Sequence, residues 1–526
     1  MKRVPLSDGS TPYAGLDWRA RAIARAVPVS GPWDEWFIPK FSHGARGGRL
    51  TPERLLELRT GSILRPKERD ALLGMLPNRE YALSWTWEEL GTISDEVEPP
   101  YRIQVECGYK VWEDAVFRIP KKVIPVGKEM IEERVRQGRF EPAWGPYRNA
   151  HILVPKKNQK YRFTISAVSA NRHTVEEAGT PPNIKELSEA FAGLPISSLI
   201  DFHSGSNQKM LHEDSRDYMV IQTMQGMYQP CRLVQGATYS VSAFVRVSQK
   251  ILNAHLGSTA EIFVDDVRVK GPKSRYRYKE VEGLPGVRTF VMEHLQNIDN
   301  VLADVERAGA TISGEKSDWC SNGVKIVVFV CGEAGRWPQV SKVYKVWNWP
   351  RCENRTECRI FLGLCIYYGI WIPEYAIVAG PVFQILRKDV EFQRETEEMK
   401  AMAMLKEALC NAPVSKTLDV SDGAGQIVMG VDASSEGWGA ILQQEDKNRD
   451  RHRCHYEREL WNKAEKRYDA GKRECRGLMK ALKMFHNYVY GVRFLVETDA
   501  NTLVHQLNLP ANDLPGALVT RWIAWI

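Results

Sequence analysis

The chain has 526 residues, which is long enough for about three or four domains. Hydrophobic residues make up 43% of it and charged residues 26%, as is ordinary for a globular protein. Its 72 Lys and Arg residues exceed its 65 Asp and Glu residues, and a net charge of +7 suits a polyanionic partner without requiring one. The first residues, MKRVPLSDGS, contain no apolar segment of a secretory signal, and the longest apolar runs are too short to cross a bilayer. We therefore expect an intracellular protein of the cytoplasm or nucleus, with no membrane partner.

The ten cysteines are scattered and form no recognisable metal-binding pattern. Neither Cys320 with Cys331 nor Cys352 with Cys358 has the CxxC spacing or the partner histidine typical of a zinc site. We expect reduced, buried thiols, as is usual for intracellular proteins.

The first 100 residues are rich in Arg, Pro, Gly and Trp, and their helical periodicity is weak outside about 51–75. We expect a poorly defined N-terminal extension without catalytic residues. Secondary-structure signals are clearer after residue 100. KEMIEERVRQG (128–138) predicts a charged helix that ends at Gly138. NAHILVPKK (149–157) and YRFTIS (161–166) then predict two strands around a basic turn.

A pair of acids lies in a predicted hairpin. IFVDDVRVK (262–270) has apolar or β-branched residues on both sides of Asp265 and Asp266, which predicts two strands with both carboxylates at the tight turn between them. Apolar positions at helical spacing precede the hairpin over 240–256, and a long amphipathic helix is predicted to follow it and to end at Gly309.

A third acid, Asp201, ends the apolar strand predicted for SSLID (197–201). Three carboxylates that a fold brings together can bind hard cations such as Mg²⁺, and two such ions roughly 3.5–4 Å apart can hold the attacking and leaving oxygens of a phosphoryl transfer. The alternative is purely structural, since Asp is common in turns and at strand ends.

A second set of acids lies in the C-terminal part. A charged helical tract near 385–425 is followed by QIVMGVDASSEGWGAILQQE (426–445), which alternates as a β-hairpin, then by a basic helix over 472–486 and the strand RFLVETD (493–499). This order of strand, helix and strand carries three acids: Asp432, Glu474 and Asp499. For Glu474 the alternative is an exposed helix residue between basic neighbours.

Four segments together carry a family resemblance. FVDD (263–266) is similar to a YxDD box, and FLGLCIYYGIWIPEY (361–375) is similar to an FLGLxxYYRxFI signature. SSLIDFHSGSNQ (197–208) resembles a strand that carries a first metal-binding Asp, and LVQGATYSVSAF (233–244) resembles a segment that packs near an incoming nucleotide. From about residue 101 to the end, the chain resembles the reverse transcriptase and ribonuclease H region of gypsy-type LTR-retrotransposon Pol polyproteins.

The resemblance implies an α+β right-hand polymerase with fingers, palm and thumb, followed by a connection and a C-terminally truncated, ribonuclease H-like α/β domain. The implied domains are an N-terminal extension (1–100), fingers and palm (101–285), thumb and connection (286–390), a helical tether (391–425) and the ribonuclease H-like domain (426–526).

Matching positions imply a polymerase site in which two Mg²⁺ ions, or Mn²⁺, are bound by Asp201, Asp265 and Asp266. The resemblance also implies a set of nucleotide-binding residues: Lys157, Arg162, Phe202, Ser206, Gln235 and Gly236. Lys156 is an equal candidate to Lys157, and Lys316 is either a proton donor to pyrophosphate or a solvated side chain. Without the resemblance, the basic residues at 156–162 read as a solvated hairpin.

The C-terminal acids Asp432, Glu474 and Asp499 are similar to the ribonuclease H catalytic set, which implies a second pair of Mg²⁺ ions that activate water to cut RNA in a hybrid. The implied partners are an RNA template, a DNA or tRNA primer, RNA/DNA hybrid, deoxynucleoside triphosphates and other Pol segments. The sequence gives no oligomeric state.

Several positions depart from the family pattern. Ser206 stands where the family usually has a Tyr that excludes a ribose 2′-hydroxyl, Ser166 and Val168 replace an Asp and an Arg while Asn171 is kept, and Gly369 replaces an Arg. Because the chain ends before the family's fourth metal-binding Asp, we expect an impaired ribonuclease H. Two alternatives stay open: a catalytically decayed, retrotransposon-derived protein that only binds RNA or hybrid, and a chain without a stable fold.

Overall fold

The computed structural model describes residues 48–106, 120–155, 161–177, 179, 182–372, 375–387, 396–411, 414–421, 423–509 and 517–523. The chain divides into two compact units. Unit 1 contains residues 1–183 and 194–324, and unit 2 contains residues 184–193 and 325–526. The basic turn with Lys156 and Lys157 lies outside the described residues.

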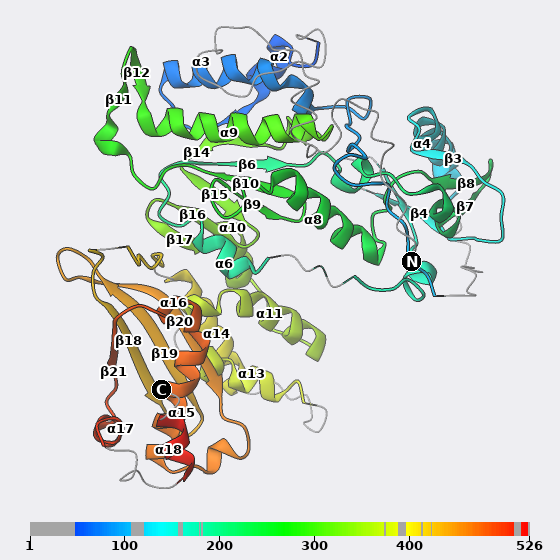
Figure 1. Cartoon of the computed structure of the whole chain (residues 1–526). Coiled ribbons are helices and arrows are strands. Elements are labelled where there is room, and N and C mark those ends of the chain that lie inside the picture. Colours follow the sequence, from blue (N-terminus) through cyan, green and yellow to red (C-terminus); the bar gives the residue numbers. More distant parts are fainter. Residues whose placement is uncertain are drawn as a thin grey trace, which may run out of the picture. The chain divides into compact units, whose positions relative to one another are not determined.

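The centre of unit 1 is a five-stranded sheet in the order β1-β14-β6-β10-β9 (Figure 1). Its strands are β1 (Arg59–Thr60), β6 (Ser197–Asp201), β9 (Ala260–Phe263), β10 (Asp266–Lys270) and β14 (Asp318–Ser321). The helices α8 (Thr238–Leu252) and α9 (Thr289–Arg307) pack on this sheet with amphipathic faces, and their buried side chains share one core with β6, β9 and β10. The hairpin and both helices expected from the sequence are confirmed.

Residues 48–100 contribute directly to this core, although their sequence gave few defined elements. They form α2 (Pro52–Glu57), β1, α3 (Pro66–Met75), the 3₁₀ helix η1 (Leu76–Ala82) and β2 (Leu83–Ser84), which pairs with β13 (Ile312–Ser313). The fully buried Arg79 forms an ion pair with Asp299 of α9, with 2.8 Å between Nε and Oδ1. Glu68 of α3 forms a second ion pair with Arg288, with 2.7 Å between Oε2 and Nη2. Two buried ion pairs therefore fasten this segment to α9 and to Arg288, the residue that precedes it, which no local periodicity could reveal.

The remainder of unit 1 consists of smaller sheets and short helices (Figure 1). A three-stranded sheet has the order β3-β8-β7, and β4 pairs with β5 in a hairpin. The strands are β3 (Phe140–Pro142), β4 (His151–Pro155), β5 (Tyr161–Ile165), β7 (Ile221–Thr223), β8 (Gly226–Pro230), β11 (Glu280–Val281) and β12 (Leu284–Arg288). The helices are η2 (Lys121–Val123), α4 (Ile124–Arg136), α5 (Val168–Asn171), η3 (Gly205–Gln208), α7 (Glu213–Arg216), η4 (Asp217–Met219) and η5 (Tyr276–Tyr278).

Unit 2 begins with α6 (Ile184–Glu189) and a three-stranded sheet, followed by a group of helices (Figure 1). The strands are β15 (Gly323–Ile326), β16 (Phe329–Gly332) and β17 (Gly335–Pro338). The helices are α10 (Val340–Trp347), α11 (Arg355–Tyr367), η6 (Gly369–Trp371), α12 (Tyr375–Val378), α13 (Gly380–Gln384) and α14 (Thr396–Cys410).

The last part of unit 2 is a four-stranded sheet in the order β20-β19-β18-β21, in which β18 and β21 are parallel and the other neighbours are antiparallel. Its strands are β18 (Ile427–Ala433), β19 (Gly437–Glu445), β20 (Arg451–Leu460) and β21 (Phe494–Glu497). Its helices are η7 (Glu465–Arg467), α15 (Ala470–Met484), α16 (His486–Val489), α17 (Asn501–Leu507) and α18 (Ala517–Ile523). Because α15, which carries Glu474, packs against β18 and β19, it covers the strand that carries Asp432.

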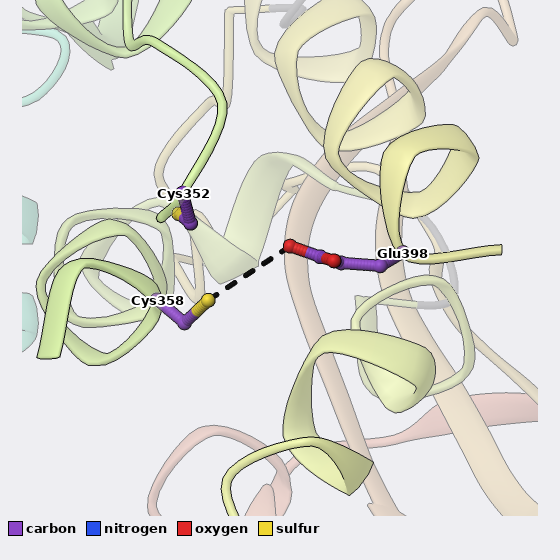
Figure 2. Close-up of side chains that lie close together, drawn as sticks. All are labelled: Cys352, Cys358 and Glu398. Atoms are coloured by element: carbon purple, nitrogen blue, oxygen red, sulfur yellow. Dashed lines mark hydrogen bonds between the residues drawn. The ribbon is translucent and has the colours of Figure 1, made fainter. Parts of the chain in front are cut away.

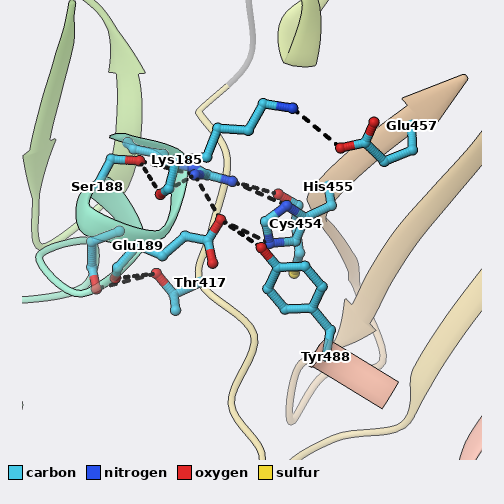
Figure 3. Close-up of polar contacts among 10 residues, drawn as sticks. Lys185, Ser188, Glu189, Thr417, Cys454, His455, Glu457 and Tyr488 are labelled. Carbon is cyan, nitrogen blue, oxygen red and sulfur yellow. Dashed lines mark hydrogen bonds and ion pairs between the residues drawn. The ribbon is translucent and has the colours of Figure 1, made fainter. Parts of the chain in front are cut away.

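Arg336 of β17 is a buried cation of unit 2, and Figure 3 labels its partners Ser188, Glu189 and Cys454. Its guanidinium donates to the Ser188 hydroxyl and the Glu189 carboxylate of α6, both at 3.0 Å, and to the Cys454 carbonyl of β20 at 3.3 Å. The Tyr488 hydroxyl of α16 donates to the same carboxylate at 3.0 Å. One side chain thus joins elements that are far apart in the sequence.

No helix in the ranges that the structure describes is long and apolar enough to span a bilayer.

Candidate functional site

The sheet of unit 1 brings the three predicted polymerase acids together. Asp201 is the last residue of β6 and Asp266 is the first of β10, and the two are direct partners in the antiparallel register. Asp265 occupies the turn between β9 and β10, where Val264 takes a positive φ of 56°. The backbone amide of Phe202 donates to the Asp265 carbonyl at 2.9 Å, which fastens this turn to the end of β6.

Burial and mutual repulsion shape the electrostatics of this acid cluster. Burial, together with the negative charges of Asp201 and Asp266, raises the pKa of Asp265 to about 6. Burial also raises the pKa of Asp201, against the opposing effect of Lys316, whose Nζ lies 3.2 Å from Oδ1 of Asp201. Asp266 pairs with the buried Arg268 at 2.9 Å. Crowded carboxylates whose ionisation is disfavoured are a suitable setting for a divalent cation.

These three acids do not form a closed ligand cluster. Among the described residues, two groups of potential ligands have all their ligand atoms within 4.8 Å of one another, and neither contains Asp201, Asp265 or Asp266. The side chains of Asp201 and Asp266 are each engaged by a cation of the chain, which accounts for this.

The predicted nucleotide-binding residues fall into different settings. Arg162 projects from β5 as an exposed side chain, while Gln235 and Gly236 are exposed in the loop before α8. Ser206 is half-buried in η3. Phe202 is 1% exposed, and its ring packs edge-on against the Phe244 ring with 5.3 Å between the ring centroids. Only the backbone of Phe202 could therefore face a nucleotide.

Sequence reasoning missed the residues that hold this surface in place. The Asn171 side-chain amide donates to the Gly236 carbonyl at 3.2 Å, and its oxygen accepts from the Thr238 amide at 2.9 Å. Asn171 therefore holds both the predicted nucleotide loop and the first turn of α8. Its retention beside the altered Ser166 and Val168 was the only signal in the sequence.

Two further positions hold η3 beside the acids. A Cβ on Gly205 would lie 2.3 Å from the Phe244 ring, so this position tolerates no side chain. Gln208 is fully buried and donates to the backbone carbonyls of His203 and Thr311 at 2.8 and 2.7 Å. Nothing in the sequence indicated these contacts, because the partners of Gln208 include a residue 103 positions away.

The second set of acids is closer together. Asp432 lies on β18, Glu474 on α15 and Asp499 just after β21, and their carboxylate oxygens lie within 4.8 Å of one another. The parallel pairing of β18 with β21 places the ends of these strands at the same edge of the sheet, opposite α15. The predicted strand, helix and strand are confirmed.

Glu474 is the half-buried member of this set, and it lies between two exposed acids. Burial raises its pKa to about 7, and the charges of Asp432 and Asp499 contribute in the same direction. Its buried Oε2 has no hydrogen-bond partner among the described residues. A cavity of about 670 Å³, lined by Asp432, Asp499 and the β20 residues Tyr456 and Arg458, opens beside the acids. Carboxylate oxygens with an unfilled buried lone pair match the ligand preference of Mg²⁺.

Known proteins resemble this chain in sequence. Residues 422–526 match the family described as an RNase H-like domain found in reverse transcriptase. The retrovirus-related Pol polyprotein from transposon 297 of Drosophila melanogaster is 25% identical over 401 residues, which cover 75% of this chain and 35% of that protein. The polyprotein from transposon gypsy of the same species is 25% identical over 414 residues, or 75% of this chain and 37% of its own length. The chain therefore spans little more than a third of these two relatives.

Solved structures show the same architecture. A foamy viral protease-reverse transcriptase in complex with double-stranded DNA has a TM-score of 0.74 at 16% identity, and the match covers 94% of this chain and 85% of that one. A second such complex has a TM-score of 0.73 at 17% identity, with coverage of 92% and 96%. Identity this low establishes the fold alone, and that fold confirms the expected α+β polymerase with a ribonuclease H-like domain. Together with the sequence matches, it shows that the chain is related to the reverse transcriptase and ribonuclease H region of gypsy-type Pol polyproteins.

Proposed function

We propose that this chain is an RNA-directed DNA polymerase that extends a primer 3′-hydroxyl along an RNA template, with an attached ribonuclease H-like domain that cuts the RNA of the resulting hybrid. The observation that carries the proposal is the opposed register of Asp201 and Asp266, with Asp265 in the adjoining turn. The sequence relatives and the fold support it.

The residues at this site fit a pair of magnesium ions. The donor set consists of carboxylates, which hard cations prefer, and mutual repulsion disfavours full ionisation until cations arrive. Mg²⁺ held by Asp201, Asp265 and Asp266 would activate the primer hydroxyl and neutralise the charge that develops on the triphosphate. To take part, Asp201 and Asp266 must exchange their contacts with Lys316 and Arg268 for the ions.

Other residues of the chain bind and orient the nucleotide in this proposal. Arg162 and Lys157 would neutralise phosphate charge, and Lys316, whose Nζ lies 3.2 Å from Oδ1 of Asp201, would donate a proton to pyrophosphate. Gln235 and Gly236 would border the incoming base, held in place by Asn171. Ser206 would leave space at the sugar where the related enzymes have a Tyr, so we propose weak exclusion of ribonucleotides.

The C-terminal acids supply the ribonuclease H part of the proposal. Asp432, Glu474 and Asp499 already lie at ligand distance, and the orphaned Oε2 of Glu474 fits a cation. The adjoining cavity, with Tyr456 and Arg458 on one wall, offers stacking and a positive charge to a nucleic-acid strand. Magnesium there would activate the attacking water.

One observation favours a second function. Because Asp201 and Asp266 are paired with cations of the chain itself, the unit 1 site is stable without metal, and a decayed protein could still bind RNA or hybrid through its Lys and Arg side chains.

Primer extension separates the two functions. With poly(rA)/oligo(dT) and Mg²⁺ or Mn²⁺, the wild-type chain should incorporate dTTP and Asp265→Asn should not, while both bind the hybrid equally at low salt. If neither protein extends the primer and both bind, only the binding function survives.

A further inference from the structure

Three potential metal ligands meet in the interior of unit 2, far in the sequence from either set of acids. Cys352 lies in the segment between α10 and α11, Cys358 lies in the first turns of α11, and Glu398 lies near the start of α14. Figure 2 shows both thiols and the carboxylate turned toward one another from these three segments. Their ligand atoms lie within 4.8 Å of one another, and Sγ of Cys358 is 3.9 Å from Oε1 of Glu398. These two thiols are buried, as the sequence led us to expect, whereas Cys410 is exposed, and the acid beside Cys352 and Cys358 was not foreseen.

The segments that carry these ligands are held by other contacts. The Asn354 side chain caps α11 by accepting from the Glu357 amide at 3.0 Å, which fixes the chain between the two cysteines. Lys406 of α14 donates to the Trp349 carbonyl at 2.5 Å and so ties that helix to the segment of Cys352. The cluster therefore does not depend on metal for its assembly, and its geometry is a property of the fold.

Burial makes this set of side chains unusual. Cys352 and Cys358 are fully buried, and Glu398 is 1% exposed. Burial raises the pKa of both thiols, so without a cation they stay protonated. Transfer of a carboxylate into such a dry site is costly unless it gains strong compensation. A divalent cation bound between two thiolates and this carboxylate is one source of such compensation.

The ligand types select the kind of cation. Two sulfurs and one oxygen favour a borderline-soft ion such as zinc over magnesium or calcium, which prefer oxygen alone. A tetrahedral zinc ion with a Zn–S bond of about 2.3 Å and a Zn–O bond of about 2.1 Å places the sulfur and the oxygen roughly 3.6 Å apart. The distance of 3.9 Å between Sγ of Cys358 and Oε1 of Glu398 needs to shorten only slightly to reach this spacing.

We propose that Cys352, Cys358 and Glu398 form a structural zinc site. Binding releases the two thiol protons, because zinc is bound by thiolates. Two thiolates and one carboxylate around Zn²⁺ leave a net charge of −1. The ion would join α11, α14 and the segment before α11. Cys365 is excluded as a ligand, because it lies seven residues after Cys358 on the same helix, about 10 Å along the axis.

The test is the zinc content of the full-length chain, purified in reductant and dialysed against a chelating resin. We expect the wild-type chain to retain about one zinc ion, because thiolate sites release metal far more slowly than exposed carboxylates. The double variant Cys352→Ser/Cys358→Ser should retain none, and Glu398→Gln should retain it only at higher zinc concentration. Cys365→Ser is the matched control, since it removes a buried thiol from the same helix and should keep its zinc.

Cobalt provides a readout that does not depend on variants folding. Added Co²⁺ should give the wild-type chain a thiolate-to-metal charge-transfer absorption with an intensity typical of two thiolates, and excess Zn²⁺ should remove it. No retained zinc and no such absorption would overturn the proposal, as would a Cys352–Cys358 disulfide found by mass spectrometry in the purified chain. Equal loss of zinc from Cys365→Ser would overturn the ligand assignment.

Discussion

Asp201 and Asp266 lie directly opposite each other on the neighbouring antiparallel strands β6 and β10. Backbone hydrogen bonds of the sheet, rather than a loop, therefore fix the separation of the two carboxylates. The position of Asp265 is also fixed by the sheet, because the backbone amide of Phe202, next to Asp201, donates to the Asp265 carbonyl and so holds the turn in place. A site built on the ends of strands is stiffer than one built on loops, as positioning of metal ions requires.

Replacing one member of this cluster should abolish polymerisation and leave the fold intact. Asp265→Asn removes a ligand charge but keeps the shape of the side chain, so primer extension should fall on the order of a thousandfold or more. Burial and repulsion already disfavour the ionised carboxylate, so the free energy of unfolding should be unchanged or slightly higher. Steady-state dTTP incorporation and chemical denaturation measure the two effects.

The matched control for that prediction is Asp318→Asn. Asp318 lies on β14 of the same sheet and makes only a long, exposed contact of 3.8 Å with Arg59. It should extend primers at the wild-type rate. An Asp265→Asn chain that extends primers as fast as this control would remove the polymerase assignment.

Asn171→Ala should weaken nucleotide binding more than it weakens the fold. The change releases the Gly236 carbonyl and the Thr238 amide, so the loop before α8 gains freedom. We expect the KM for the incoming nucleotide to rise several-fold with a smaller effect on kcat, at a stability cost of about 1 kcal/mol. Single-nucleotide kinetics with saturating primer–template measures KM and kcat separately. A fall in kcat at constant KM would contradict the proposed role of Asn171 in nucleotide binding.

Much of the fold was predictable because its elements carry strong local patterns. The hairpin around Asp265 and Asp266, the helix that ends before Gly309 and the strands with Asp432 and Asp499 all follow from periodicity and turn residues. The role of residues 48–100 was not predictable. Their place in the core depends on buried ion pairs such as Arg79 with Asp299, which join positions 220 residues apart.

The acids of the candidate site could be predicted from the sequence, but the residues that hold them in place could not. The acids are visible because they stand at strand ends and in a tight turn, where the sequence pattern changes. The supporting contacts of Gln208 and Asn171 are not visible, because each is defined by distant partners. The buried group of Cys352, Cys358 and Glu398 is invisible for the same reason, since its acid comes from a helix 40 residues further along.

Glu474→Gln should separate the two activities. The substitution removes the negative charge of the residue that lies between Asp432 and Asp499. It also replaces one carboxylate oxygen, such as the buried Oε2 that has no hydrogen-bond partner among the described residues, with an amide nitrogen, which cannot bind a cation. Cleavage of RNA in a labelled hybrid should fall roughly a hundredfold or more, while primer extension stays at the wild-type rate. Asp450→Asn, an exposed acid of the loop before β20, serves as control. Loss of both activities in Glu474→Gln would show that the substitution damages the whole chain.

His294 should make the stability of unit 1 depend on pH. Its ring is fully buried, Nδ1 donates to the Lys270 carbonyl at 3.2 Å, and Nε2 accepts from the Ser198 hydroxyl at 2.8 Å. Burial lowers its pKa from 6.5 to about 4, so the unfolded chain binds the proton more readily than the folded one. Its contribution is fully present above pH 6.5 and declines by up to ~3 kcal/mol as the pH falls toward 4.

The pH profile of a variant isolates this contribution. Across that interval the unfolding free energy of His294→Gln should change less with pH than that of the wild-type chain, even though the variant is less stable at neutral pH. His486→Gln, which changes an exposed residue of α16, should keep the wild-type profile. Parallel profiles for the wild-type chain and His294→Gln would show that His294 is not the responsible group.

Arg336→Met should destabilise unit 2 strongly, because it leaves a buried carboxylate without its cation (Figure 3). Arg336 is 1% exposed, and its partner Glu189 is largely buried. Removing one member of a buried ion pair typically costs about 3–5 kcal/mol, and Arg336 also donates to Ser188 and to the Cys454 carbonyl. Urea denaturation followed by tryptophan fluorescence measures the loss, with the exposed Arg453→Met of β20 as control.

The cause of that loss can be tested with a second substitution and with pH. Burial already raises the pKa of Glu189, and the loss of Arg336 removes the main opposing effect. A raised pKa in the folded state favours folding at low pH, so the stability gap between Arg336→Met and the wild-type chain should narrow as the pH falls. Arg336→Met/Glu189→Gln should recover part of the stability at neutral pH, because the Tyr488 hydroxyl can still donate to the amide oxygen. A gap that is independent of pH and unaffected by Glu189→Gln would mean that lost packing, rather than the stranded carboxylate, destabilises the variant.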